Sequence, residues 1–102
     1  MRRAEVSMHG LPAGILEEIE RKKYGFVYFE NYDGPPISLT IPVEEKEFVF
    51  DRFPPFFDGL LPEGLLLEGL LKYRKIDKYD YFSQLVAVGN DLVGAVTVRE
   101  IK

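Results

Sequence analysis

Side chains that could carry catalysis are few in this sequence. His9 is the single histidine and there is no cysteine, so thiolate metal sites, a cysteine nucleophile and disulfides are unavailable. Ser7, Ser38 and Ser83 lack the Gly-x-Ser-x-Gly context of a nucleophile elbow. We therefore expect no catalytic serine and no metal site, with His9 exposed at the end of a strand.

Two carboxylate pairs have the residue types for acid/base chemistry, namely Asp58 with Glu63 and Asp77 with Asp80. Both pairs stand where helices are expected to begin, and capping and the helix dipole explain them. The glycines form neither a Gly-x-Gly-x-x-Gly nor a P-loop pattern, and the kinase motifs His-Arg-Asp and Asp-Phe-Gly are missing. The sequence therefore predicts a non-enzymatic protein without a cofactor.

The elements that position these residues begin as a predicted antiparallel meander. Alternating and β-prone residues predict strands over Ala4–His9, Ile15–Glu20 and Tyr24–Glu30, although a short helix also fits Ile15–Glu20. Turns are expected at residues 10–14 and 31–34, which are rich in Gly, Pro, Asn and Asp.

Prolines bracket Ile37–Ile41 and leave room for a short edge strand, and another strand is expected over Glu47–Asp51. After a first helix, Asp77 or Asp80 can cap a second one that runs to about Val88, and Leu92–Ile101 alternates as a final strand. The predicted fold class is α+β. A small antiparallel sheet, made of the meander and a closing C-terminal strand, packs with two short helices in one domain over residues 1–102.

The stretch from Arg52 to Tyr73 organises this prediction. Pro54 and Pro55 hold the backbone extended, so that Phe56 and Phe57 are delivered as a buried aromatic pair. After a turn at Asp58-Gly59, Pro62 suits the first turn of a helix that runs to about Arg74.

This first helix carries more apolar surface than one contact requires. At 100° per residue its apolar side chains cover about 240°, whereas a single core contact needs an arc of about 100°. Two of its faces must therefore be covered. One can be covered by the chain's own sheet, and for the other a second helix and a different protein both remain open. The apolar residues are Leu65, Leu66, Leu67, Leu70, Leu71 and Tyr73.

Composition and charge restrict the partners. The chain has 102 residues, of which 46% are hydrophobic, and carries a net charge of −4. An acidic chain is repelled by phosphate backbones, so direct nucleic-acid binding is not expected. The basic run at residues 21–23 follows three glutamates and is interpreted as a solvated strand end or turn. Neither a membrane span nor a signal peptide is recognisable, and a cytoplasmic location is expected.

Several motifs follow one another along the chain: Gly14-x-Leu16, Phe26-x-Tyr28, Pro36-Ile37-Ser38-x-Thr40-x-Pro42, Pro55-Phe56-Phe57-x-x-Leu60-Leu61-Pro62-Glu63-Gly64 and Asp80-x-Phe82-x-x-Leu85-x-x-x-Gly89-x-Asp91-x-x-Gly94-Ala95. With these motifs, which span roughly residues 10–98, the chain resembles the N-terminal subdomain of the HipA family of bacterial Ser/Thr kinase toxins. The run Phe-Phe-x-x-Leu-Leu-Pro-Glu-Gly is the most specific part.

A HipA-like toxin continues into several hundred residues of kinase, whereas this sequence ends at Lys102 and lacks the kinase motifs. Within the family it is most similar to HipS, the separately encoded small subunit of three-gene HipBST toxin–antitoxin systems. The resemblance implies a domain that binds a HipA/HipT-like Ser/Thr kinase toxin and neutralises it as an antitoxin. A HipB-like DNA-binding protein can join a ternary complex.

Two alternatives stay open at this point. The chain can be a structural subunit that scaffolds the kinase without inhibiting it, or an excised N-terminal subdomain of a full-length HipA-type kinase. A stand-alone enzyme and a direct DNA binder are disfavoured by the missing motifs and by the negative charge.

The resemblance and the over-wide apolar helix together predict a partner-binding region. Where the family often has an arginine, this sequence has Leu67, which fits a surface that a partner covers. The two phenylalanines are expected to act as supporting core. The predicted contact residues and their support are Phe56, Phe57, Leu61, Glu63, Leu66, Leu67 and Leu70.

Overall fold

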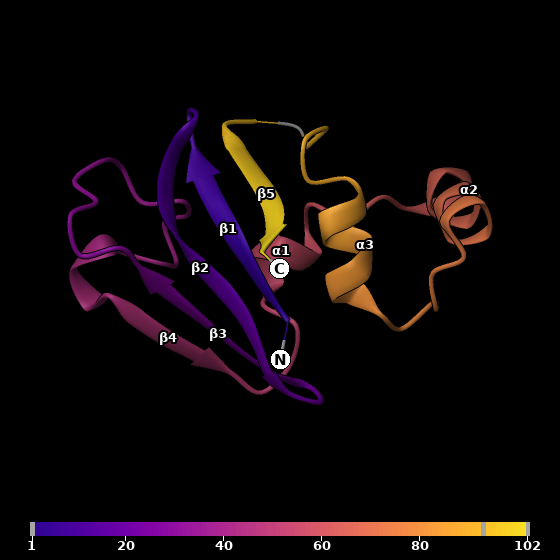
Figure 1. The fold of residues 1–102 in the computed structure, drawn as a ribbon, viewed down its shortest axis with the longest axis horizontal. Coiled ribbons are helices and arrows are strands. Elements are labelled where there is room, and N and C mark those ends of the chain that lie inside the picture. Colours follow the sequence, from indigo (N-terminus) through magenta and orange to yellow (C-terminus); the bar gives the residue numbers. More distant parts are fainter. Residues whose placement is uncertain (1, 93, 102) are drawn as a thin grey trace.

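A computed structural model describes residues 2–92 and 94–101, and within them an antiparallel sheet carries three helices (Figure 1). The strand order is β4-β3-β2-β1-β5, so the closing strand pairs with the first one, and the expected α+β fold is confirmed. The strands are β1 (Arg3–Met8), β2 (Leu11–Glu20), β3 (Lys23–Tyr28), β4 (Glu47–Phe50) and β5 (Val96–Ile101). The helices are α1 (Pro55–Asp58), α2 (Gly64–Arg74) and α3 (Tyr81–Ala87), with a 3-10 turn at Val43–Glu45.

One face of the sheet carries the core. Alternate residues such as Val6, Leu16 and Phe26 are completely or almost completely buried there, because successive side chains of a strand point to opposite faces. Phe57 of α1 and Phe82 of α3 are fully buried against this face. Each such side chain contributes about 1.5–3 kcal/mol when it leaves water. The opposite face carries charged side chains, among them Glu5 and Arg99, which form an ion pair at 3.1 Å.

The first hairpin is tighter than expected. The turn predicted over residues 10–14 is reduced to His9 and Gly10, and β2 already begins at Leu11. Pro12 is tolerated in the strand because it pairs with Ser7 where the register of β1 and β2 shifts. The alternative of a short helix over residues 15–20 is wrong, since this part of β2 pairs with both neighbours.

The edge strand predicted over Ile37–Ile41 is also wrong, and the segment forms a tight turn with a single bridge between Ser38 and Ile41. The buried hydroxyl of Tyr28 accepts a hydrogen bond from the Ile37 N–H at 3.0 Å and donates one to the Ile41 carbonyl. Burial raises the pKa of this hydroxyl, which keeps it protonated as a donor. The turn presents Leu39, whose side chain is 95% exposed.

The double proline does not keep the following backbone extended throughout. Pro54 is extended, but Pro55 is the first residue of α1, a position where its missing N–H costs nothing. This short helix was not expected. Phe57 is completely buried as predicted, while Phe56 is half-buried and packs edge-on against it with ring centres 5.1 Å apart.

The region after α2 follows the prediction more closely. Asp80 caps α3, and its carboxylate accepts a hydrogen bond from the Ser83 N–H at 3.1 Å. Gly89 then passes so close to β5 that an added Cβ would lie 1.8 Å from the Val98 carbonyl oxygen. The last strand begins at Val96 instead of at Leu92, and Val93 within the predicted range lies outside the described residues.

Replacing Gly89 with Ala should therefore lower the free energy of unfolding by about 3 kcal/mol or more, because a backbone oxygen cannot move aside as a flexible side chain can. Gly59→Ala is the matched control, since its Cβ would make only ordinary contacts at 3.5 Å or longer. Urea unfolding of both variants provides the measurement. Equal stability of Gly89→Ala and the wild type would contradict this packing.

Candidate functional site

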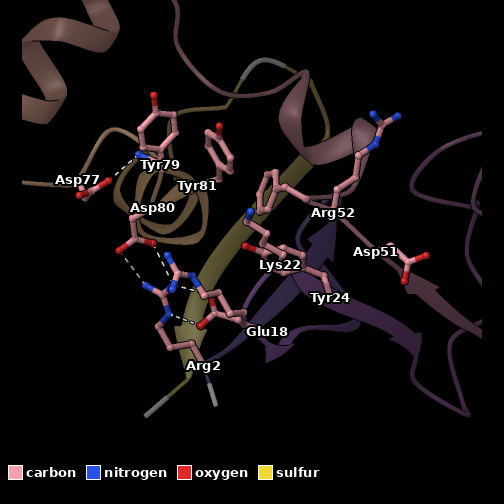
Figure 2. Close-up of a pocket in the computed structure, with 12 residues that line it drawn as sticks. Arg2, Glu18, Lys22, Tyr24, Asp51, Arg52, Asp77, Tyr79, Asp80 and Tyr81 are labelled. Carbon is pink, nitrogen blue, oxygen red and sulfur yellow. Dashed lines mark hydrogen bonds and ion pairs between the residues drawn. The ribbon is translucent and has the colours of Figure 1, made fainter.

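A polar groove of about 710 Å³ opens between the β2–β3 turn, the segment before α1 and the start of α3 (Figure 2). It combines acidic, basic and aromatic side chains, which are the groups that a polar ligand or a reaction would need. Its lining includes Arg2, Glu18, Asp77 and Asp80.

Arg2 pairs with carboxylates on two separate elements at one side of this groove (Figure 2). Its guanidinium donates two hydrogen bonds to Glu18 at 2.8 and 2.7 Å, and it approaches Asp80 to 2.9 Å. The same guanidinium donates to the Ser83 hydroxyl at 2.7 Å and lies 4.9 Å from the centre of the Phe82 ring. These contacts tie the start of the chain to β2 and to the start of α3.

The ion network shifts the pKa values of Arg2 and Asp80 so that both side chains favour their charged forms. The hydrogen bond with Glu18 is the main reason that the pKa of Arg2 is raised. Burial alone would raise the pKa of Asp80, but hydrogen bonds from Arg2 and Ser83 outweigh this effect and lower it. A carboxylate that is held ionised by fixed donors is a poor proton acceptor, which favours a structural role for Asp80.

The other three carboxylates of the two pairs have separate local roles. Asp77 accepts a hydrogen bond from the Tyr79 N–H at 2.7 Å, so it shapes the approach to α3. Asp58 ends α1 and so does not cap a helix start, while Glu63 occupies the N-cap position of α2 without a side-chain cap. The capping interpretation is thus confirmed for Asp80 and wrong for Asp58, whereas Glu63 stands at the start of α2 as expected but makes no side-chain cap. Within residues 2–92 and 94–101, no cluster of three potential metal ligands occurs.

Helix α2 has no buried residue, although it carries five leucines. It lies beyond α3, away from the sheet (Figure 1), and all of its residues are exposed or half-exposed. The expectation that the chain's own sheet covers one face of this helix is therefore wrong. The position of α2 is decided where it begins. Leu60 and Leu61 still pack on the core, and Gly64, the first residue of α2, then turns the chain outward with a left-handed φ of 59°.

The apolar side chains of α2 fall into two groups. Leu67, Leu70 and Leu71 are half-exposed, whereas Leu65 and Leu66 are 85% and 77% exposed. Tyr73 is 86% exposed and shares the outward side with Leu65 and Gly69, because residues four apart lie on the same side of a helix. We call the surface formed by Leu65, Leu66, Gly69 and Tyr73 the outward face of α2.

The predicted contact residues divide between this helix and the body of the domain. Leu66, Leu67 and Leu70 lie on α2, with the exposed Glu63 just before it. Phe57 is buried and can act only as support, and the half-buried Phe56 and Leu61 pack against the core. Their role in partner binding stays a prediction.

Sequence reasoning left three outward residues out of the contact set: Leu65, Gly69 and Tyr73. The signal that could have found them is their spacing of four residues, which places them on one side of any helix over this stretch. The predicted contact residues lie instead around the Pro-Glu-Gly motif and Leu67.

The charge network at α3 makes a prediction for acid stability. Asp80→Asn keeps a cap acceptor but removes the charge opposite Arg2, and should lower the free energy of unfolding at neutral pH by about 1 kcal/mol. Because folding lowers the pKa of Asp80 below its ordinary value of 3.8, this stabilisation is present above that value and is lost as the pH falls through the folded-state pKa.

Unfolding of wild type and Asp80→Asn should therefore be compared from neutral pH down into acid, where the difference is expected to shrink as the pH falls below 3.8 and through the folded-state pKa of Asp80. Asp58→Asn is the control, since Asp58 is exposed at the end of α1. A difference between wild type and Asp80→Asn that does not change with pH would contradict the ion pair.

Comparison with known proteins agrees with this geometry. The family model described as "HipA N-terminal domain" matches residues 4–99. The solved structure titled "N-terminal domain of HipA toxin" is similar with a TM-score of 0.79 at 30% identity, covering 100% of this chain and 94% of that one. No helix within the described residues is both long and apolar enough to cross a membrane.

Two relatives have very different lengths. An uncharacterized protein of Haemophilus influenzae is 34% identical, and the match covers 100% of this chain and 95% of that protein. A Sinorhizobium fredii protein named "Putative kinase Y4dM" is 32% identical, but the match covers 93% of this chain and only 26% of that protein. Because the family model spans almost all of the sequence and the fold agrees, the chain belongs to the HipA N-terminal domain family.

Proposed function

We propose that this chain is a non-enzymatic subunit that binds a HipA/HipT-like Ser/Thr kinase toxin and neutralises it, as the antitoxin of a tripartite toxin–antitoxin system. The observation that carries the proposal is α2, a helix with leucines around most of its circumference whose residues all remain exposed or half-exposed.

Helix α2 is expected to be only marginally stable without a partner. An isolated helix shorter than about 12–15 residues is marginal in water, and α2 has 11 residues including two glycines. Burying a leucine side chain contributes about 1.5–3 kcal/mol, so a partner that covers Leu65 and Leu66 would stabilise the helix. Contiguous exposed apolar surface of this kind marks protein interfaces.

The kinase as partner is supported by the relatives. In the Sinorhizobium protein with a kinase name, the matched region is about a quarter of the chain, so a similar unit stands beside other sequence there. In the Haemophilus protein the matched region is nearly the whole chain. These two arrangements support a subunit that, like HipS, docks on a kinase encoded separately, with a HipB-like DNA-binding protein as a third member.

The chain's own chemistry is consistent with a binding role. The carboxylates of Glu18 and Asp80 are held by Arg2, and the net charge of −4 disfavours contact with nucleic acid. A sequence without cysteine fits a reducing compartment, and we place the proposed complex in the cytoplasm.

The direct experiment is co-expression with the HipA-type kinase encoded beside this chain. We expect a stable complex after co-purification, and the kinase should lose its toxicity and its autophosphorylation when the chain is present. A complex with unchanged activity would replace the antitoxin by a scaffolding subunit. The absence of such a kinase gene would mean instead that α2 faces a further part of a longer toxin.

Substitutions on α2 test the surface. Leu66→Asp and Leu67→Asp should each weaken the complex at least about 100-fold, because a carboxylate would have to be desolvated in an apolar interface. The fold should be retained, since Leu66 is 77% exposed and Leu67 is half-exposed. The thermal midpoint and a titration against the kinase measure the two effects.

Leu39→Asp is the matched control, because Leu39 is an equally large, 95% exposed leucine on a turn far from α2 in the chain. It should bind the kinase as the wild type does. Undiminished binding of Leu67→Asp, or equal losses from Leu39→Asp, would remove α2 from the interface.

A further inference from the structure

Gly69 lies in the middle of α2, where glycine is unfavourable. A glycine inside a helix is less stable than alanine by about 0.5–1 kcal/mol, because it loses more backbone freedom on folding. This cost occurs in a helix that is already marginal by its length. A structural reason for glycine at this position is therefore needed.

The reasons that explain other glycines do not apply to Gly69. An added Cβ on Gly14 would lie 2.2 Å from the Val27 carbonyl oxygen, and Gly64 has a left-handed φ of 59°. For Gly69 the φ angle is an ordinary one, and an added Cβ would meet no described atom within 4 Å, its own helix backbone and chain neighbours aside. The described part of the chain thus tolerates alanine here.

The surroundings of Gly69 form a notch on the outward face of α2. Leu65 stands one turn before Gly69 and Tyr73 one turn after it, and both side chains project into solvent with 85% and 86% of their surface exposed. Leu66 flanks the glycine at a distance of three residues. The floor of the notch is bare helix backbone and its walls are large apolar side chains.

We propose that this notch receives a large aliphatic or aromatic side chain from a helix of the kinase toxin, which crosses α2 at close range over Gly69. The inference rests on the proposed function and specifies how the kinase is held. Packed helices interdigitate side chains at axial distances of 8–10 Å, and a glycine at the crossing point permits the lower end of this range. The closer approach increases the dispersion contacts made by Leu65 and Tyr73.

The end of α2 and the end of β5 lie on the same side of the domain, which favours the kinase as the occupant of the notch. Arg74 and Ile76 at the base of α2, and Glu100 near the end of β5, line the same hollow beside α3. The family is described as an N-terminal domain, so in longer members the chain continues after the last strand. The segment after β5 in such a protein therefore starts beside α3, at the hollow that the last residue of α2 also lines, and a separately encoded kinase can occupy the same side of the domain.

The test measures the affinity of the full chain for the HipA-type kinase encoded beside it. Gly69→Ala should bind at least about tenfold more weakly and Gly69→Leu at least about 100-fold more weakly, because the added atoms fill the notch. Both variants should have the helicity and thermal midpoint of the wild type or higher values, since each residue favours helix over glycine.

Glu68→Ala is the control, because it changes helix propensity at the neighbouring position, about 100° around the helix from Gly69. It should bind within twofold of the wild type. Binding of Gly69→Ala that equals or exceeds that of the wild type would overturn the notch while leaving the proposed function intact. A wild-type chain that does not bind the kinase would overturn both.

A footprint gives a second readout, because the chain has no cysteine of its own. Single variants Leu65→Cys and Glu68→Cys are alkylated with a maleimide in the presence and absence of the kinase. We expect the kinase to slow the reaction of Leu65→Cys at least tenfold and that of Glu68→Cys less than twofold. Equal protection at both positions, or none at Leu65→Cys, would contradict occupation of the notch.

Discussion

Phe57, Phe82 and Leu85 pack on the single buried face of the sheet, and the limited area of this face decides where the rest of the chain can lie. In a chain of 102 residues the five-stranded sheet carries its core on one face, and α1, α3 and the connection from β3 to β4 already cover it. The apolar surface of α2 has no place left on the core. The position of α2 outside the body of the domain therefore follows from the packing of the two shorter helices.

The connections around α3 turn this packing into a defined geometry. Arg2 ties the start of the chain to Asp80 at the beginning of α3, and Gly89 lets the chain after α3 lie directly against Val98 of β5. With both ends of α3 fixed, the segment before it is also placed, and α2 lies beyond α3 with Arg74 at its end lining the same hollow as Glu100. A partner that binds to α2 contacts a helix that is less stable than the domain that carries it. Ordering this helix would reduce the free energy gained on binding.

The sequence predicted the sheet and the main helices because their periodicity follows from burial on one side. The alternation of Val96 and Val98, and the apolar spacing of Phe82 and Leu85, reflect contacts with one core face. Prolines misled the prediction where their effect depends on context. Pro12 fits into β2 only because of the register shift opposite Ser7. Pro55 begins a helix, although it could equally have extended the chain.

The candidate site was predictable in kind but not in arrangement. An apolar arc of about 240° indicated that α2 needs more cover than a single contact, but it could not indicate that the sheet would supply none. That outcome depends on Leu60 and Leu61 taking the remaining core positions and on the backbone angle of Gly64, which are tertiary features. The outward set around Gly69 depends in the same way on knowing which side of the helix faces solvent.

Helix α2 lacks cover within its own domain and, as we propose, gains it from the kinase. Amide hydrogen exchange measures this directly, because local opening free energies range from near zero to that of global unfolding. In the chain alone, the amides of α2 should exchange much faster than those of α3, and in the complex with the kinase they should become protected while those of α3 change little. Protection of α2 equal to that of α3 in the isolated chain, or no change on adding the kinase, would contradict the account.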